Sequence, residues 1–272
     1  MIRAMAGAKL AAKPFKWIPL PPGLWRAAAS FLFAAIVWEI TARYIVGNPL
    51  FLSSLSDIAA RTVTLWHDGD LQTNIWVSFV EFAWGYGSAA VVGILAGIVL
   101  AEWRTLRQFS DPLISMLYAT PIIALGPLFI LWLGIGVISK IAIIFLTAVF
   151  PIIINTVAGL TTTDRTLIEV ARSLGATPKQ IYTKVRLPSS LPFIIAGLRL
   201  SVARALVGVV IAELFGARAG LGFMIVNSAQ SFDTAAVFVG VLILAVAGVV
   251  SVELLKLLEA KLAPWRGNDQ EG

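Results

Sequence analysis

The sequence predicts an all-α integral membrane protein with about six transmembrane helices. Of its 272 residues, 58% are hydrophobic and only 13% are charged, and its mean hydropathy is +0.88. A soluble domain of this length needs far more polar surface. Apolar runs of close to twenty residues recur, and each can cross the roughly 30 Å hydrocarbon layer as a helix. The runs are continuous rather than alternating, so a transmembrane β-barrel is excluded.

Six segments meet the requirements for a spanning helix. The first follows residues 13–26, where lysines, tryptophans and prolines favour the headgroup layer of the bilayer. We expect this stretch to be retained, because the apolar run after it is too long for a cleaved signal peptide. The predicted spans are residues 27–46, 75–101, 112–133, 139–160, 192–215 and 235–255.

The positions of Lys and Arg predict the orientation. The segments before residue 27, at 102–110, at 161–190 and after 255 hold fifteen of the 21 basic residues. Positive charge favours the cytoplasmic side, so both termini and 161–190 are expected there. The opposite side holds four: Arg43, Arg61, Lys140 and Arg218.

The chain then divides into three parts. Residues 1–26 are a cytoplasmic interfacial segment, 27–255 form the transmembrane domain, and 256–272 are a cytoplasmic tail. The spans use most of the chain, so no separate soluble domain is expected. The net charge of +6 follows the membrane topology, and we expect no nucleic-acid partner.

Residues 161–190 are a charged island in this apolar sequence. Asp164 (or Thr163) is a plausible N-cap for a first short helix. Gly175 permits a turn after it, and Thr177-Pro178 suits the start of a second helix. Leu187-Pro188 is expected to end that helix before the fifth span. The island therefore reads as two short helices that form a docking surface.

The island resembles the EAA loop of bacterial ABC-importer permeases. That loop has Glu-Ala-Ala, three residues, Gly, nine residues, Ile, any residue and Leu-Pro. Two positions depart conservatively, Val170 and Val185. The matching residues are Glu169, Ala171, Gly175, Leu187 and Pro188.

The resemblance continues outside the loop. Residues 120–160, 212–225 and 232–240 are similar to permeases of the nitrate/sulfonate/taurine type, and the similarity spans roughly 75–255. It implies a type I ABC-importer permease fold in the bacterial inner membrane. It also implies a homodimer, two ABC ATPase subunits and an external solute-binding protein as partners.

The same resemblance implies roles for the island. Its coupling helix would seat in a cleft of the ATPase, with contacts from Glu169, Val170, Ala171, Arg172 and Ala176. Gly175 would allow the tight bend. The sequence has no Gly-x-x-x-x-Gly-Lys-Ser/Thr loop. ATP and Mg²⁺ are therefore expected on the partner ATPase, with no cofactor and no catalytic residue in this chain.

Four residues within the spans are candidates for the translocation pathway. Arg204 lies near the middle of the fifth span, where a charge costs roughly 2.5–3.5 kcal/mol on insertion scales. It either lines the pathway and attracts anions, or makes a buried bond to carbonyls or to a carboxylate. Glu213 lies nearer the outer end and faces another side of the helix, where it could contact the closing region or the binding protein. Pro121 and Pro127 would kink the third span beside a pathway.

Three smaller features are best interpreted as structural rather than functional. Glu39 and Arg43 stand four apart, a spacing that allows a neutralising pair. Gly93 and Gly97 suit close helix packing. His67 with Asp68 and Asp70 could bind a metal, but a solvated loop is the better reading, so no metal site is expected.

An ion-coupled secondary transporter is the alternative function. It would favour carboxylates at the midplane and an inverted repeat, and neither is evident. A membrane enzyme would need catalytic groups in the spans, and a single loop histidine does not provide them. The expected cargo is a small anionic or organic solute, whose identity the sequence leaves open.

Overall fold

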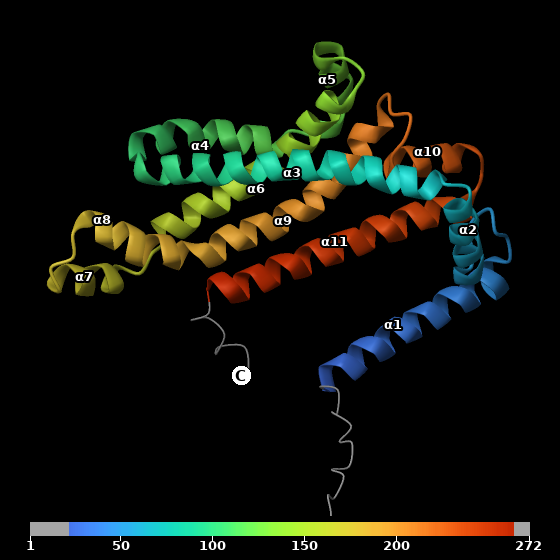
Figure 1. Ribbon diagram of the computed structural model, residues 1–272, viewed down its shortest axis with the longest axis horizontal. Helices are drawn as coiled ribbons and strands as arrows, with labels where there is room; N and C mark the ends of the chain where they lie inside the picture. Colours follow the sequence, from blue (N-terminus) through green and yellow to red (C-terminus); the bar gives the residue numbers. More distant parts are fainter. Residues whose placement is uncertain (1–21, 264–272) are drawn as a thin grey trace, which may run out of the picture.

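The computed structural model describes residues 22–263, and every regular element in this range is a helix. Predictions for the N-terminal tail fall mostly outside the described residues. Figure 1 shows long helices running together, with short ones at both ends. The elements are α1 (Pro22–Ile40), the π-helical turn η1 (Thr41–Val46), α2 (Leu55–His67), α3 (Asp70–Glu102), α4 (Arg104–Ala119), the 3₁₀ turn η2 (Ile122–Leu125), α5 (Gly126–Leu133), α6 (Val137–Thr161), α7 (Arg165–Ser173), α8 (Pro178–Ile181), the π-helical turn η3 (Tyr182–Arg186), α9 (Leu187–Leu214), α10 (Leu221–Gln230) and α11 (Thr234–Leu262).

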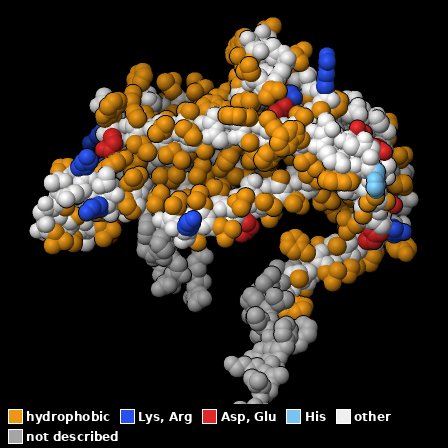
Figure 2. Space-filling model, viewed as in Figure 1, with side chains coloured by type: hydrophobic (Ala, Val, Ile, Leu, Met, Phe, Trp, Pro, Cys, Tyr) orange, Lys and Arg blue, Asp and Glu red, His pale blue; other side chains and the backbone are white. Residues whose placement is uncertain are grey.

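The predicted fold class is confirmed. Five helical segments are long and apolar enough to cross a membrane, and a sixth span follows if one bent helix pair is counted. Figure 2 shows apolar side chains over the middle of the face in view, with charged side chains toward the ends. The five straight segments are Ala28–Val46, Asp70–Glu102, Val137–Thr161, Pro178–Leu214 and Thr234–Leu262.

The third predicted span is wrong as a single helix over 112–133. The chain forms α4, then η2 and α5, and the two arms meet at an angle of 83°. Thr120 has an extended backbone (φ −69°, ψ 130°), the conformation that a following proline imposes on the residue before it. Pro121 also lacks the N–H that a continuous helix would use. The break therefore follows from Thr120-Pro121.

A row of small residues on one face of α3, here called the glycine register, lets α3 pack closely against α6. Gly85, Ala89, Gly93 and Gly97 recur every fourth residue along one face of α3, and all four are buried. A Cβ added at Gly85, Gly93 or Gly97 would lie 2.6, 2.9 or 2.5 Å from side chains of α6. The packing role predicted for Gly93 and Gly97 is confirmed, because only glycine lets the helices approach so closely. The facing side chains are Ile144, Ile152 and Thr156, each 59 residues after its glycine.

Helix α9 packs on α6 and completes the membrane core. A Cβ at Gly197 would lie 2.7 Å from Asn155, and one at Gly208 would lie 2.4 Å from Thr147. The Ser201 hydroxyl donates to the Ala148 carbonyl at 2.8 Å, inside the core. Helices α3, α6 and α9 thus form one tightly packed unit.

A second apolar cluster lies at the end of the molecule where α2 and α10 meet the starts of α3 and α11 (Figure 1). Neither α2 nor α10 was predicted. Gly69 (φ +83°) makes the turn from α2 into α3, and the stretch around His67 belongs to this turn. Arg61 of α2 pairs with Asp233 before α11 at 2.7 Å. The buried members of the cluster are Ile58, Leu65, Leu71, Leu221, Met224, Ala236 and Val239.

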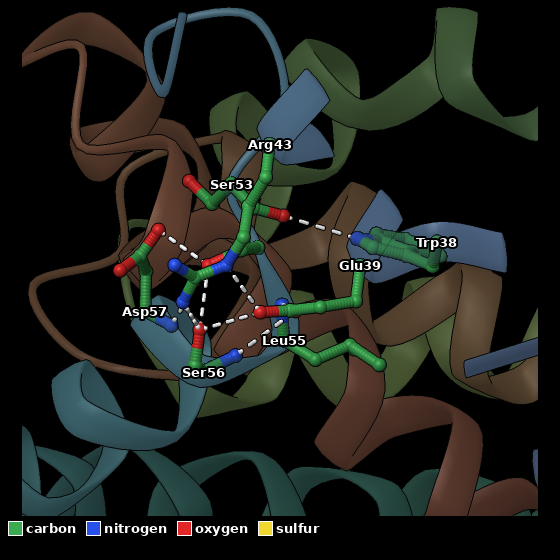
Figure 3. Close-up of polar contacts among 8 residues, drawn as sticks. Trp38, Glu39, Arg43, Ser53, Leu55, Ser56 and Asp57 are labelled. Carbon is green, nitrogen blue, oxygen red and sulfur yellow. Dashed lines mark hydrogen bonds and ion pairs between the residues drawn. The ribbon is translucent and has the colours of Figure 1, made fainter. Parts of the chain in front are cut away.

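A polar cluster ties α1 to the same end (Figure 3). The predicted Glu39–Arg43 pair is confirmed, with 2.6 Å between Oε1 and Nε. The Glu39 carboxylate also accepts from the Leu55 backbone N–H at 2.7 Å and from the Ser56 hydroxyl at 2.8 Å. The Trp38 indole donates to the Ser53 carbonyl at 3.0 Å. The end of the first span is therefore fixed to the start of α2.

Candidate functional site

The island at 161–190 has the predicted short helix α7, the predicted turn at Gly175 and a second helix that begins at Pro178. Asp164 caps α7 by accepting from the Thr166 N–H at 2.8 Å. Gly175 makes the turn with φ +78°, a left-handed backbone that glycine adopts freely. Thr177 starts α8 in a capping box with Gln180, and Pro178 occupies the first turn. Together these residues fix the bend between α7 and α8.

The prediction that Leu187-Pro188 ends the second helix is wrong. The chain stays helical from Pro178 to Leu214. The π-helical turn η3 lies just before Leu187, whose N–H donates to the Tyr182 carbonyl, five residues back. The wider turn accommodates a proline that cannot donate. The second helix of the island is therefore a direct extension of the fifth span.

Arg186 anchors the island to the membrane core. Its guanidinium pairs with Glu102 at the end of α3 at 3.0 Å and donates to the Leu160 carbonyl at the end of α6 at 3.1 Å. Neither contact was predicted, because the partners lie 84 and 26 residues away in the sequence.

Helix α7 presents an apolar stripe that no other described segment covers. Leu167, Val170 and Leu174 are 51%, 53% and 82% exposed, and their spacing places them on one helix face. Glu169 and Arg172 are also exposed, whereas Ala171 and Ala176 are half-buried. Val185, Leu187 and Pro188 are half-buried where the island joins α9. An apolar stripe on a charged helix is the pattern of a helix that docks on a partner.

Arg204 faces an open cleft of about 550 Å³ between α4, η2, α6 and α9. Its Nη2 donates to the Tyr118 hydroxyl at 2.7 Å, and its Cζ lies 4.4 Å from the centre of the Tyr118 ring. Among the described residues, Arg204 has neither a carbonyl nor a carboxylate partner. The alternative that it makes a buried structural bond is therefore not supported. Pro121 lines the same cleft. Pro127 lies apart from it, exposed in the first turn of α5.

Glu213 lies elsewhere, inside the molecule, and is only 1% exposed. Its carboxylate accepts from the Ser78 hydroxyl at 2.5 Å and from the Gly222 N–H at 2.6 Å. The prediction that Glu213 and Arg204 do not face each other is confirmed. Glu213 has no surface for a binding protein in this conformation, and its place is that of a cap for α10.

The first turn of α10 is held entirely by side chains of α3 and α9. The Gly220 N–H donates to Asn74 at 2.7 Å, and the Leu221 N–H donates to Ser78 at 2.7 Å. The next N–H groups, of Gly222 and Phe223, donate to Glu213. The first N–H groups of a helix have no partner within the helix itself, and here side chains of two other helices supply the acceptors. The second apolar cluster, where α2 and α10 meet the starts of α3 and α11, is thereby joined to the membrane core.

A buried ion pair lies one helical turn before the glycine register. Lys140 Nζ is 2.6 Å from Glu81 Oε1, with side-chain exposures of 9% and 1%. Lys140 was counted among the basic residues on the side opposite the island, and its pairing with Glu81 was not predicted. Arg199 is likewise paired, with Glu259 of α11. Within residues 22–263, no three His, Cys, Asp or Glu side chains gather to hold a metal ion.

Comparisons with known proteins agree with this arrangement. Residues 89–264 match the family described as "Binding-protein-dependent transport system inner membrane component". The chain is 43% identical to the putative aliphatic sulfonates transport permease protein SsuC of Bacillus subtilis, over 75% of this chain and 72% of that protein. It is 30% identical to the taurine transport system permease protein TauC of Escherichia coli, over 96% and 98%. It is 34% identical to the formylaminopyrimidine transport permease protein ThiX of Halalkalibacterium halodurans, over 87% and 94%.

A solved structure supports the fold. A chain of the MetNI methionine ABC transporter, in an inward-facing conformation, matches with a TM-score of 0.61 and 19% sequence identity, over 71% of this chain and 95% of that chain. At this identity the likeness concerns the fold alone. The chain belongs to the binding-protein-dependent transport system inner membrane components: it is the multi-pass inner-membrane permease subunit of an ABC importer, not an enzyme, and it works with a solute-binding protein and with a separate ATPase that binds the ATP.

Proposed function

We propose that two copies of this permease form one pathway for a small organic anion, driven by ATPase subunits that dock on the island at 161–190. The apolar stripe of α7 is the single observation that carries the docking half of the proposal. Leu174 is 82% exposed in a helix that also carries Glu169 and Arg172. Burying such a side chain against a partner is worth about 1.5–3 kcal/mol, while the charges fix the register of the contact.

The roles of the island residues follow from their positions. Glu169 and Arg172 make polar contacts to the ATPase, and Val170 adds apolar contact. Gly175 and Ala176 set the bend, and the Ala171 carbonyl accepts the Ala176 N–H at 3.0 Å. Val185, Leu187 and Pro188 pass the movement of the island into α9, because the helix is continuous there.

We also propose that the island and both termini lie on the cytoplasmic side of the membrane. Figure 1 places the end of α11 at the same end of the molecule as α7 and α8, with α2 and α10 at the other. This arrangement supports the proposal because the basic residues gather at the island end.

The solute class rests on two observations. Relatives are named for aliphatic sulfonates and for taurine, and taurine is itself a sulfonate. Arg204 and Pro121 line the open cleft of this chain, and we place the pathway there. Glu213 and Pro127 are not part of that cleft, so they are not kept as pathway residues. A second copy would close the open side of the cleft.

The test of docking is co-purification of the ATPase with island variants of the permease. Glu169→Lys, Leu174→Asp and Gly175→Trp should each release the ATPase and abolish ATP-driven uptake. A Cβ at Gly175 meets nothing within 4 Å, but its φ of +78° disfavours any other residue, so Gly175→Trp should distort this turn. The spans should stay folded, because the turn lies outside the packed unit of α3, α6 and α9. Asp68→Lys is the matched control, since it reverses a charge on an exposed turn at the opposite end.

Two results would count against the proposal. Full ATPase retention in Leu174→Asp would mean that the stripe is not the contact. Equal loss in Asp68→Lys would mean that charge reversal disturbs assembly in general. The homodimer has its own test, the mass of the purified complex, and a single permease copy per complex would exclude it.

A further inference from the structure

Four basic side chains lie inside the predicted spans, and Arg204 differs from the other three in having no carboxylate partner among the described residues. Arg43 pairs with Glu39, Lys140 with Glu81, and Arg199 with Glu259. A guanidinium in a membrane span is costly unless it faces protein, water or a ligand of opposite charge. The positive charge of Arg204 is therefore left for something outside the described chain.

Tyr118 holds this charge in place without neutralising it. The hydroxyl of Tyr118 accepts one hydrogen bond from Nη2 at 2.7 Å, and its ring lies under the guanidinium at 4.4 Å. A neutral phenol adds no negative charge, and it uses one of the five guanidinium N–H donors. The other donors have no partner among residues 22–263, and the side chain is exposed to the cleft.

The cleft is suited to an organic anion. Its wall is mostly apolar, with Ile122, Ile123 and Ile211 among the lining residues, and it contains no acidic side chain. A planar guanidinium with free N–H groups matches the oxygens of a sulfonate or a carboxylate, often with two parallel hydrogen bonds. A volume of about 550 Å³ has room for a small organic group beside that contact.

We infer that Arg204 and Tyr118 form an anion-recognition site in this cleft, in which Arg204 binds the oxyanion of the solute and Tyr118 positions the guanidinium. The apolar tail of the solute packs on the isoleucines. This inference rests on the proposed pathway, and it adds the recognition chemistry and a residue that sequence reasoning missed. An anionic lipid headgroup carries the same oxyanion chemistry, so the experiment must separate the two sources.

The test uses the assembled importer in nanodiscs of phosphatidylcholine, which has no net charge. Binding of butanesulfonate, butanol and butylammonium is measured by ligand-observed NMR. We expect the sulfonate to bind and the other two to bind at least about tenfold more weakly, because a charge-assisted contact is lost. Repeating the measurement with phosphatidylglycerol separates a solute site from a lipid site: sulfonate binding must persist.

Three variants assign the residues. Arg204→Gln should weaken sulfonate binding at least about tenfold. Arg204→Lys should retain part of it, because it keeps charge but loses the planar fork. Tyr118→Phe keeps the ring and loses the hydroxyl, so the guanidinium is held by one contact fewer and we expect sulfonate affinity to fall about threefold. If Arg204→Gln fails to fold, Arg204→Lys and Tyr118→Phe still decide.

The inference is overturned if butanol binds as well as butanesulfonate, if Arg204→Gln and Arg204→Lys both bind the sulfonate like the parent chain, or if phosphatidylglycerol displaces it. Unchanged binding in Tyr118→Phe would remove the positioning role. ATPase co-purification from the same samples tests the proposed importer separately. An assembled complex without sulfonate selectivity would contradict the anion site and the proposed solute class but would leave the proposed ATPase docking intact. Failed assembly of the parent complex would contradict the docking half of the proposed function.

Discussion

The buried pair Glu81–Lys140 permits a quantitative prediction. Replacing Glu81 with Leu leaves the Lys140 ammonium in a site where its side chain is only 9% exposed. Removing one partner of a buried ion pair typically costs about 3–5 kcal/mol, because the other charge is left uncompensated. We expect Glu81→Leu and Lys140→Met each to lower the free energy of unfolding by about this amount.

The double variant shows whether the cost of each single variant comes from the lost contact or from the unpaired charge that remains buried. Glu81→Leu with Lys140→Met removes both charges and keeps similar volume, so it should lie within about 1 kcal/mol of the parent chain. The two substitutions would then be strongly non-additive. The position favours this result, since the pair lies in the same register as the contacts of Gly85 with Ile144 and of Gly93 with Ile152, where leucine and methionine find apolar neighbours.

The assay is unfolding of the purified permease in mixed micelles, with increasing sodium dodecyl sulfate and tryptophan fluorescence as the signal. The reasoning would be refuted if each single variant lowered the free energy of unfolding by less than about 1 kcal/mol. It would also be refuted if the double variant lowered it by the sum of the two single effects. In that case water or a second copy must reach Lys140.

Two further predictions use the same assay, and one uses hydrogen exchange. Gly97→Ala should lower the free energy of unfolding by about 1–3 kcal/mol, since its Cβ would lie 2.5 Å from Thr156. Gly87→Ala is the control: nothing lies within 4 Å of its Cβ, so it should be neutral or slightly stabilising. Equal effects of the two substitutions would argue against close packing of α3 on α6. Asp233→Ala should cost about 1–2 kcal/mol, because Asp233 both caps α11 and pairs with Arg61; an effect no larger than that of Arg61→Ala would mean that the cap contributes nothing. Asp164→Ala should speed backbone hydrogen exchange in α7 about fivefold, as expected for a lost N-cap of about 1 kcal/mol, while exchange in α9 stays unchanged; protection that persists in α7 would show that the cap is not needed.

Hydropathy and local chemistry predicted most of the fold. The spans at 75–101, 139–160, 192–215 and 235–255 correspond to long helices because a twenty-residue apolar run has few alternatives in a bilayer. The island was predictable for a different reason. Its cap residue, turn glycine and proline act within a few positions, so Asp164, Gly175 and Thr177 could be placed without knowing what surrounds them.

Contacts between distant segments could not be predicted in this way. Glu81 and Lys140 are 59 residues apart, and Arg204 and Tyr118 are 86 apart, so their pairing depends on helix packing rather than on local pattern. The same limit applies to Glu213, whose role as a cap exists only because α10 begins beside it. Helices α2 and α10 are short and carry ordinary polarity, so hydropathy does not single them out. The prolines were noticed, but the 83° bend depends on how α4 and α5 pack.

The constant offset between α3 and α6 restricts how this permease can move. Sliding α6 by one residue along α3 would press isoleucine side chains onto positions that have a Cβ, whereas the present alignment places them over glycines. A shift that restored the fit would need four residues, about 6 Å along the helix axis. Shear between these two helices is therefore blocked, and they must travel as one rigid body. Any opening and closing of the pathway has to occur at their edges, where the α4–α5 arm bends at Pro121 and touches Arg204 through Tyr118.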